Sequence, residues 1–398
     1  MVVVLGPRLV HHDTRGRADF AFARLPAIRV GIRPCGRRAS KTRPIKANPE
    51  LLPPGSSVPK GQKAMVHCSD ISTLLASVPP LLGFIPENSL VCMICEEQKV
   101  IMTLRIDLPD PTQSEIFAQK IAHIVLGQGE NVTAIVAVFG GGALTSAGTP
   151  PHADLIDALH RLLGDDHLAH GAALWAEACA EGARWCCYCG ECDVSGTLPD
   201  PSATELAAES AAAGVVTHAR RSELARYVAT ASEHDVARRA ALLGDMSSTW
   251  ACSSREALAL VRDAVHAMAR GDLEADDAFI ARMAMALDDE RVRDASLSFA
   301  AEEHATAAEH LFFMLTRECP APYRAEPAVL AAFYSYLRGE GALASMALDA
   351  AVEAAPGHGL TKLLRFAIDS ATPSAVLRHL VHRAGVEAVA MLAEDSDE

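Results

Sequence analysis

Four cysteines lie within seven residues of this chain and form its densest group of reactive side chains. The segment is Cys186-Cys187-Tyr188-Cys189-Gly190-Glu191-Cys192, and Cys179 precedes it. Two cysteines separated by two residues, such as Cys189 and Cys192, can both reach one tetrahedral zinc ion as thiolates. The spacing therefore predicts a structural zinc site with Cys186, Cys189, Cys192 and Cys179 as ligands.

Other interpretations of the cysteine segment remain open. A zinc ribbon usually has a second pair of cysteines or histidines farther along the chain, whereas here only His167, His170 and Cys252 are available. Cys187 is an alternative to Cys179 as the fourth ligand. The remaining alternatives are redox-sensitive thiols and half-buried cysteines that pack as small apolar side chains without a metal.

A second candidate site lies on a predicted β-hairpin formed by Leu90–Cys95 and Val100–Leu108. Because side chains alternate along a strand, Arg105 and Asp107 project from the same face. Both are candidate ligand-binding residues, with Arg105 holding an anion, and Asp107 or Glu87 is a weak candidate for acid–base catalysis. The alternative is a solvated face or a structural ion pair, because close charge pairs are commonly structural.

A run of glycines, Gly140-Gly141-Gly142, follows the apolar segment Val132–Phe139. Open sheets often bind ligands at the ends of their strands, so this position is suited to a phosphate-binding loop. No G-x-G-x-x-G pattern and no Walker lysine accompanies the glycines, however. The pattern therefore favours a flexible connector over a phosphate cradle.

Before residue 201, short apolar strands alternate with amphipathic helices. Asp70 can cap a first helix, and Pro79-Pro80 ends or bends it. The helices and strands predicted after the hairpin are Gln113–Leu126, Val132–Phe139, His152–Leu163 and Ala172–Ala176. This order predicts an α/β domain over residues 65–201, with a mixed sheet and flanking helices.

Beyond residue 201, apolar residues recur at about every fourth position, and the pattern predicts helices alone. The predicted helices are Ala203–Ala213, Arg221–Ala229, Asp235–Leu243, Arg255–Ala269, Ala275–Leu287 and Ala301–Thr316. We therefore expect an all-α domain over residues 202–320.

The segment Gly339–Pro356 has the pattern of the second helix of a tetratricopeptide-like unit, with a glycine turn, small residues and a closing proline. Val329–Leu337 is the expected first helix, and Leu360–Ile368 and Ser374–His382 are expected to stack on the pair. We assign residues 321–385 to this part of the chain. A cap on the protein's own core is favoured over a peptide-binding groove, because solenoid recognition generally needs about three repeats.

Charge is distributed unevenly along the chain. Residues 1–64 contain 13 Lys/Arg against 3 Asp/Glu and are rich in proline, whereas the remainder has 23 Lys/Arg against 47 Asp/Glu. The basic segment predicts a disordered extension, or sequence translated upstream of a natural start at Met65. The acidic body argues against nucleic acid as the main partner. Residues 386–398 are expected to be a helix end and a frayed acidic tail.

The apolar runs are too short for a membrane protein, since none approaches the roughly 18–20 residues that span a bilayer. The chain has 11 cysteines, without the spacing of a disulfide framework, which suits a reducing compartment. We therefore expect a cytoplasmic protein with no membrane partner.

The residues from Leu74 to Val91 resemble the opening of the actinobacterial domain-of-unknown-function 4192 family. The resemblance covers most of residues 68–375 and continues through Leu104–Pro109, Arg184-Trp185, the cysteines, Pro199-Asp200-Pro201, Val292–Ala295 and Gly339–Pro356. Members carry a segment of the form C-x(4–5)-C-C-P at the position of the cysteines, so the spacing here departs from the family pattern. The resemblance implies no activity. The family has no counterpart to residues 1–64, which agrees with a start at Met65.

Two classes of function are compatible with these features. The first is a non-enzymatic interaction or regulatory protein, in which an α/β domain with a possible zinc knuckle accompanies a helical surface that docks a protein partner. The second is an enzyme that acts on a small anionic substrate at the sheet edge, near Arg105. The first is preferred, because no set of nucleophile, base and orienting group can be named from the sequence.

Overall fold

The computed structural model describes residues 2–5, 27–30, 65–68, 70–169, 172–190 and 194–373, together with parts of 376–390. The chain forms two compact units. One, the α/β unit, comprises Leu25–Leu81 and Pro86–Val216; the other, the helical unit, comprises Met1–Arg24, Leu82–Ile85 and Thr217–Glu398. The prediction of an α/β domain followed by an all-helical domain is confirmed.

The α/β unit is built on a mixed sheet with the strand order β3-β2-β5-β4-β6-β7-β8-β9. The strands are β2 (Ala27–Val30), β3 (Met65–Cys68), β4 (Ser89–Glu96), β5 (Lys99–Asp107), β6 (Val132–Phe139), β7 (Ala173–Ala176), β8 (Arg184–Cys187) and β9 (Ser195–Thr197). The pairs β2–β3 and β6–β7 are parallel and the others are antiparallel. The predicted hairpin is β4–β5, and the predicted strand Val132–Phe139 is β6 with the same bounds.

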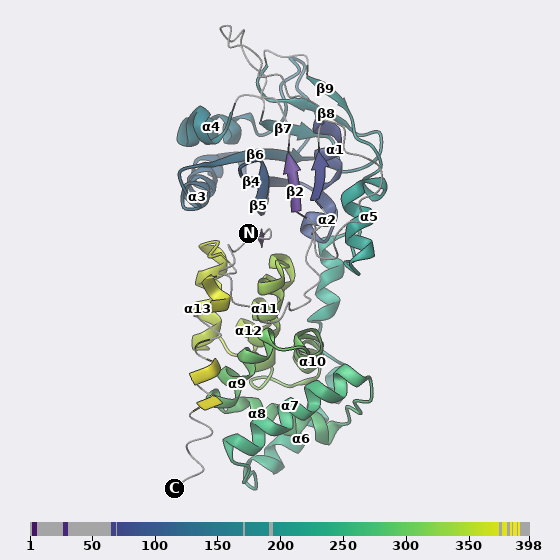
Figure 1. Cartoon of the computed structure of the whole chain (residues 1–398), viewed down its shortest axis with the longest axis vertical. Helices are drawn as coiled ribbons and strands as arrows, with labels where there is room; N and C mark the ends of the chain where they lie inside the picture. The colour runs from purple at the N-terminus through teal and green to yellow at the C-terminus, as the bar shows by residue number, and fades with distance from the viewer. Residues whose placement is uncertain are drawn as a thin grey trace, which may run out of the picture. The chain divides into compact units, whose positions relative to one another are not determined.

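The helices of the α/β unit are α1 (Ile71–Ala76), α2 (Val78–Leu82), α3 (Ser114–Leu126), α4 (Ala153–His167) and α5 (Glu205–Ala212). The carboxylate of Asp70 accepts a hydrogen bond from the Thr73 N–H at 2.8 Å and caps α1, as predicted. The chain then bends at Ser77, and the two prolines lie within the short helix α2. Helices α3 and α4 pack side by side (Figure 1).

The structure differs from the sequence-based expectation at several places in this unit. Strands β3, β8 and β9 were not predicted, although β8 holds part of the cysteine segment. Strand β2 lies in the stretch expected to be disordered, and its Ile28 and Val30 side chains are buried. Helix α5 was assigned to the helical domain, whereas it belongs to the α/β unit. Most of residues 1–64, and the acidic tail, lie outside the described residues.

The helical unit contains α6 (Glu233–Ser247), α7 (Ser254–Arg270), α8 (Asp277–Asp288), α9 (Glu290–Ser296), α10 (Ala305–Glu318), α11 (Ala325–Arg338), α12 (Gly341–Ala354) and α13 (Gly359–Asp369). Helices α10, α11 and α12 pack in succession (Figure 1). The segment predicted as a helix at Arg221–Ala229 is a 3₁₀ helix, η3 (Arg221–Tyr227). A short strand, β1 (Val2–Leu5), also belongs to this unit.

Helices α11 and α12 form the predicted hairpin. Gly339 ends α11 with a positive φ of 93°. This is the left-handed conformation, which glycine adopts at low cost. The side chains of α11 are buried along almost the whole helix, so the hairpin lies in the core of its unit. Its assignment as a tetratricopeptide-like repeat stays a prediction.

A short segment of the chain between α2 and β4 belongs to the helical unit although it interrupts the α/β unit. The N–H of His218 donates to the Gly83 carbonyl at 2.8 Å, and the N–H of Ile85 donates to the His218 carbonyl at 3.0 Å. These bonds place Phe84 beside His218 in an isolated β-bridge.

Within the described residues, no helix combines the length and the apolar character needed to cross a bilayer.

Candidate functional site

The main candidate site lies where β5 ends and β4 begins, and it is centred on Arg105. The Arg105 Nε donates to the Ser89 hydroxyl at 2.8 Å, and Nη2 donates to the Glu87 carbonyl at 3.4 Å. Nη2 also lies 2.7 Å from Oδ1 of Asp107. The antiparallel register explains the geometry. Ser89 lies opposite Asp107, and Asp107 is two residues from Arg105, so all three side chains share one face of the sheet.

The two charged partners of this ion pair differ sharply in burial. The Arg105 side chain is 6% exposed, whereas the Asp107 side chain is 77% exposed. The guanidinium is therefore fixed within the protein, while its counter-ion reaches into solvent. Arg105 and Asp107 are neighbours, as predicted, and they form an ion pair in which only Asp107 lies on a solvated surface.

The predicted acid–base candidate Glu87 contributes its backbone carbonyl to Arg105, and Glu87 as a whole is exposed. Asp107 is exposed as well. A carboxylate that acts as a general acid or base usually needs an apolar environment to retain a proton near neutral pH. The geometry around Arg105 therefore supports ligand binding rather than proton transfer.

The glycine run is held against the start of β4 by Asn88. The side-chain oxygen of Asn88 accepts a hydrogen bond from the Gly141 N–H at 3.1 Å. Gly140 and Gly141 have φ of 77° and 78°. A Cβ on Gly140 would lie 2.8 Å from Oδ1 of Asn88, and one on Gly141 would lie 2.7 Å from Cδ1 of Leu108. The glycines are thus required by close approach, and the loop is not simply a flexible connector.

His152, which the sequence analysis did not single out, lies beyond this loop at the start of α4. It adopts a left-handed conformation with a φ of 59°, and a Cβ on Gly141 would lie 2.8 Å from its Cδ2. Its Nδ1 is buried without a hydrogen-bond partner in the described part of the chain. Burial lowers the pKa of His152, so the neutral imidazole is favoured.

His152 and Arg105 lie on opposite faces of the sheet. Arg105 shares a line of directly opposed residues with Val91, Ala137, Leu174 and Cys187, and opposed residues share a face. Leu108 lies on the other face of the sheet, because it continues the β5 side chains that alternate with Arg105 and Asp107. This is the face on which His152 lies. The structure therefore does not bring an imidazole base to the Arg105 site.

The cysteine segment continues from β8 into a turn. The Cys187 sulfur accepts a hydrogen bond from the Cys189 N–H at 3.3 Å. On the same strand face as Cys187, Nε1 of Trp185 donates to the Ser72 hydroxyl of α1 at 2.9 Å. Cys187 and Trp185 therefore point toward α1, and Cys186 points to the opposite face.

Cys179 lies on the α1 side as well, where its thiol donates to the Leu75 carbonyl at 3.8 Å. Burial raises the pKa of Cys179 to about 12. The structure thus places Cys179 and Cys186, two of the four predicted zinc ligands, on opposite faces of the sheet. Cys192 lies outside the described residues, and among those described no group of three or more metal-binding side chains is gathered. The four-cysteine zinc site stays a prediction.

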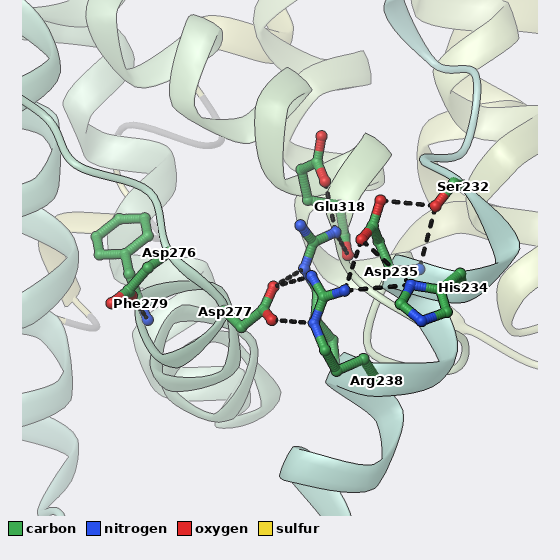
Figure 2. Close-up of polar contacts among 9 residues, drawn as sticks. Ser232, His234, Asp235, Arg238, Asp276, Asp277, Phe279 and Glu318 are labelled. Carbon is green, nitrogen blue, oxygen red and sulfur yellow. Dashed lines mark hydrogen bonds and ion pairs between the residues drawn. The ribbon is translucent and has the colours of Figure 1, made fainter.

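The helical unit contains a network of ion pairs that joins three helices. Figure 2 shows Arg238 of α6 between Asp235 and Asp277, with Glu318 of α10 nearby. Nε of the neighbouring Arg239 donates to Asp277 of α8 at 2.8 Å, and its Nη1 donates to Glu318. The arginines hold the pKa of Asp277 down at about 2. Every charged group in this network has an opposite partner, so we interpret it as structural.

Glu309 of α10 is the most deeply buried carboxylate among the described residues and was not predicted. The residue is 1% exposed, and its Oε1 accepts a hydrogen bond from the Ser335 hydroxyl at 2.9 Å. Its Oε2 lies 2.8 Å from Nε of Arg338, which also contacts Glu340. Burial raises the pKa of Glu309 to about 7, and Arg338 only partly offsets the effect. The signal in the sequence is an acidic residue on the apolar face of its helix.

His358 begins α13 and combines with a glutamate and a threonine. Its Nδ1 accepts a hydrogen bond from the Thr361 N–H at 3.2 Å, and its Nε2 lies 3.0 Å from Oε1 of Glu326. The Thr361 hydroxyl is buried and contacts Nδ1 at 2.7 Å. The group therefore caps α13 and fixes its first turn; a buried hydroxyl is unsuited to attack a substrate.

The outer face of α13 carries two large apolar side chains that are more exposed than any other among the described residues of the helical unit. Leu363 is 69% exposed and Phe366 is 73% exposed. The two residues are three positions apart and so lie on one face of the helix. Neither residue was singled out from the sequence.

The fold and the candidate sites together define a protein with a mixed-sheet α/β unit and a mainly helical unit. Comparison with family models matches residues 72–375 to the family described as Domain of unknown function (DUF4192). The match covers more than half of the chain, so the chain belongs to this family, and the resemblance noted from the sequence is confirmed. No curated protein and no solved structure matches the chain.

Proposed function

We propose that this chain is a non-enzymatic regulatory protein whose α/β unit binds a small anion at Arg105. The observation that carries the proposal is the unequal burial of the Arg105–Asp107 pair. The cation is fixed by Ser89 and by the Glu87 carbonyl, whereas its charged partner is solvent-exposed.

Such a pair can exchange its anion at low cost. Release of the Asp107 carboxylate costs little, because its side chain is 77% exposed and water solvates it almost as well as the protein does. A buried guanidinium, in contrast, needs a partner. A ligand carboxylate or phosphate can therefore take the position of the Asp107 carboxylate while Arg105 keeps its other contacts. A carboxylate or a phosphate can accept two parallel hydrogen bonds from the fork of a guanidinium, which favours these two chemical classes.

The test compares binding of inorganic phosphate and of a panel of small carboxylates to three variants, measured by isothermal titration calorimetry. Asp107→Asn removes the competing charge and is expected to tighten binding by up to about 5-fold, the equivalent of a surface ion pair. Arg105→Gln is expected to abolish binding. The matched control is Glu96→Gln, which makes the same charge change at an exposed residue at the other end of β4.

The proposal fails if no anion of the panel binds to the wild type or to Asp107→Asn. It also fails if Glu96→Gln tightens binding as much as Asp107→Asn does, because the effect would then reflect net charge alone.

The alternative function, an enzyme acting on a small anionic substrate at the same place, has less support. The carboxylates near Arg105 are exposed, and His152 lies on the other face of the sheet. Catalysis would need a base within hydrogen-bond reach of a ligand held by Arg105. A protein partner for the helical unit, and a zinc ion held by Cys186, Cys189, Cys192 and Cys179, are further parts of the proposed interaction protein, and both are open to direct test.

A further inference from the structure

We propose that the outer face of α13 is a docking surface for α13 of a second copy of this chain, in an antiparallel arrangement. The inference concerns the helical unit and is independent of the anion site proposed for the α/β unit.

The first step is the composition of this face. At 100° per residue, Lys362, Leu363, Phe366 and Asp369 fall on one side of the helix, and all four are exposed. The opposite side carries Thr361, Leu364 and Ile368, which are buried in the unit. Helix α13 thus has two apolar faces, of which only one is covered within the described residues. Single exposed apolar residues are common on protein surfaces, whereas Leu363 and Phe366 lie together on one face of the helix.

The second step is the order of charges along the face. Lys362 lies near the start of α13 and Asp369 is its last residue, with the apolar pair between them. Neither charge has an ion-pair partner in the part of the chain that the structure describes. By contrast Arg365, on the flank of the helix, is engaged by Asp349 and Ser345 of α12.

The order of basic, apolar and acidic residues is complementary to itself when the second helix runs in the opposite direction. Lys362 of each copy then approaches Asp369 of the other, so two ion pairs form on either side of a contact made by Leu363 and Phe366. A parallel arrangement would instead place like charges together, which is unfavourable. Antiparallel pairing also brings the positive end of each helix dipole to the negative end of the other. A two-fold axis through the centre of α13 generates this contact and closes the assembly as a dimer.

The starting point of α13 is fixed independently of any partner. His358, Glu326 and Thr361 hold the first turn through the contacts described above. The face is therefore presented with little loss of conformational freedom on association, which favours binding.

The experiment is sedimentation-velocity ultracentrifugation of the full chain over a concentration series. The wild type is expected to dimerise. Phe366→Ser and the charge reversal Lys362→Glu are each expected to weaken the dimer by about 10-fold or more, since each change acts twice across the two-fold axis. The double reversal Lys362→Glu with Asp369→Lys restores opposite charges and is expected to recover dimerisation. Ile116→Ser, at an exposed apolar residue of α3 in the other unit, is the matched control.

A wild type that stays monomeric up to about 100 μM would overturn the proposal, because a specific interface of any consequence forms below that concentration. A dimer that is unaffected by Phe366→Ser, or that the double reversal does not restore, would show that the contact lies elsewhere. Circular dichroism of each variant shows whether α13 and its unit remain folded, and the rescue by the second charge reversal can be observed only in a folded protein.

Discussion

Replacing Glu309 by glutamine should stabilise the helical unit at neutral and alkaline pH. Glu309 is buried between α10 and α11, and burial raises the pKa of its carboxyl from the ordinary 4.5 to about 7. The glutamine variant keeps the shape and a hydrogen-bonding group for Ser335 but has no charge to bury. The comparison therefore isolates the free-energy cost of ionising this carboxyl inside the protein.

The expected magnitude follows from the shift in pKa. The pKa of Glu309 is raised in the folded state, so its protonated carboxyl contributes to the free energy of unfolding. This contribution is complete below about pH 4.5 and is lost as the pH rises through about 7. One pKa unit corresponds to about 1.4 kcal/mol, so the full shift corresponds to about 3 kcal/mol. The free energy of unfolding of Glu309→Gln, relative to wild type, should therefore rise by up to about 3 kcal/mol between acid and alkaline conditions.

Urea denaturation of both proteins between about pH 5 and about pH 8, followed by circular dichroism, measures this difference. Titrations elsewhere in the chain occur in both proteins and cancel in the comparison. Glu303→Gln changes an exposed glutamate of the same unit and serves as the control. A difference between wild type and Glu309→Gln that is the same at both ends of the pH range would refute the reasoning, since ionisation of Glu309 would then carry no energetic cost.

Two further predictions concern the α/β unit. If zinc is bound by the cysteine segment, metal analysis of the protein purified under reducing conditions should show about one ion per chain. This ion should be lost in Cys189→Ser and in Cys192→Ser. A wild-type protein without metal, together with unchanged stability of both variants, would eliminate the zinc site. Gly141→Ala should destabilise this unit by about 1–3 kcal/mol, because the new methyl group meets Leu108 and a positive φ is unfavourable for alanine. Gly148→Ala has a similar φ of 80° but no atom within 4 Å of the added Cβ, so equal thermal unfolding midpoints for the two variants would contradict the role assigned to close packing at Gly141.

The elements that the sequence predicted well are those with a strong local pattern. The run Val132–Phe139 is apolar except for Thr133 and has the length of a buried strand, which is what β6 proves to be. The Asp70 cap is likewise a local signal, because the capping bond joins residues three positions apart. Strands β8 and β9 were missed since they are short and contain cysteines and turn residues. Their strand structure depends on the pairing of β8 with β7 and of β9 with β8.

The candidate site depended on information that a single strand does not contain. Alternation placed Arg105 and Asp107 on one face, but only the register with β4 brings Ser89 to the guanidinium. The unequal burial of the pair follows from tertiary packing. The same holds for α13, whose two apolar faces are visible in the sequence, although only the packed unit shows which one is covered.

The bonds between His218 and the segment around Phe84 bear on how the chain can be divided. A fragment that begins at Thr217 contains every helix from α6 onward, yet it lacks Gly83 and Ile85, so the backbone N–H and carbonyl of His218 lose their partners. Leaving such groups unpaired away from water is unfavourable. Limited proteolysis between β9 and η3 should consequently yield two pieces that stay associated in native buffer and separate only when denatured.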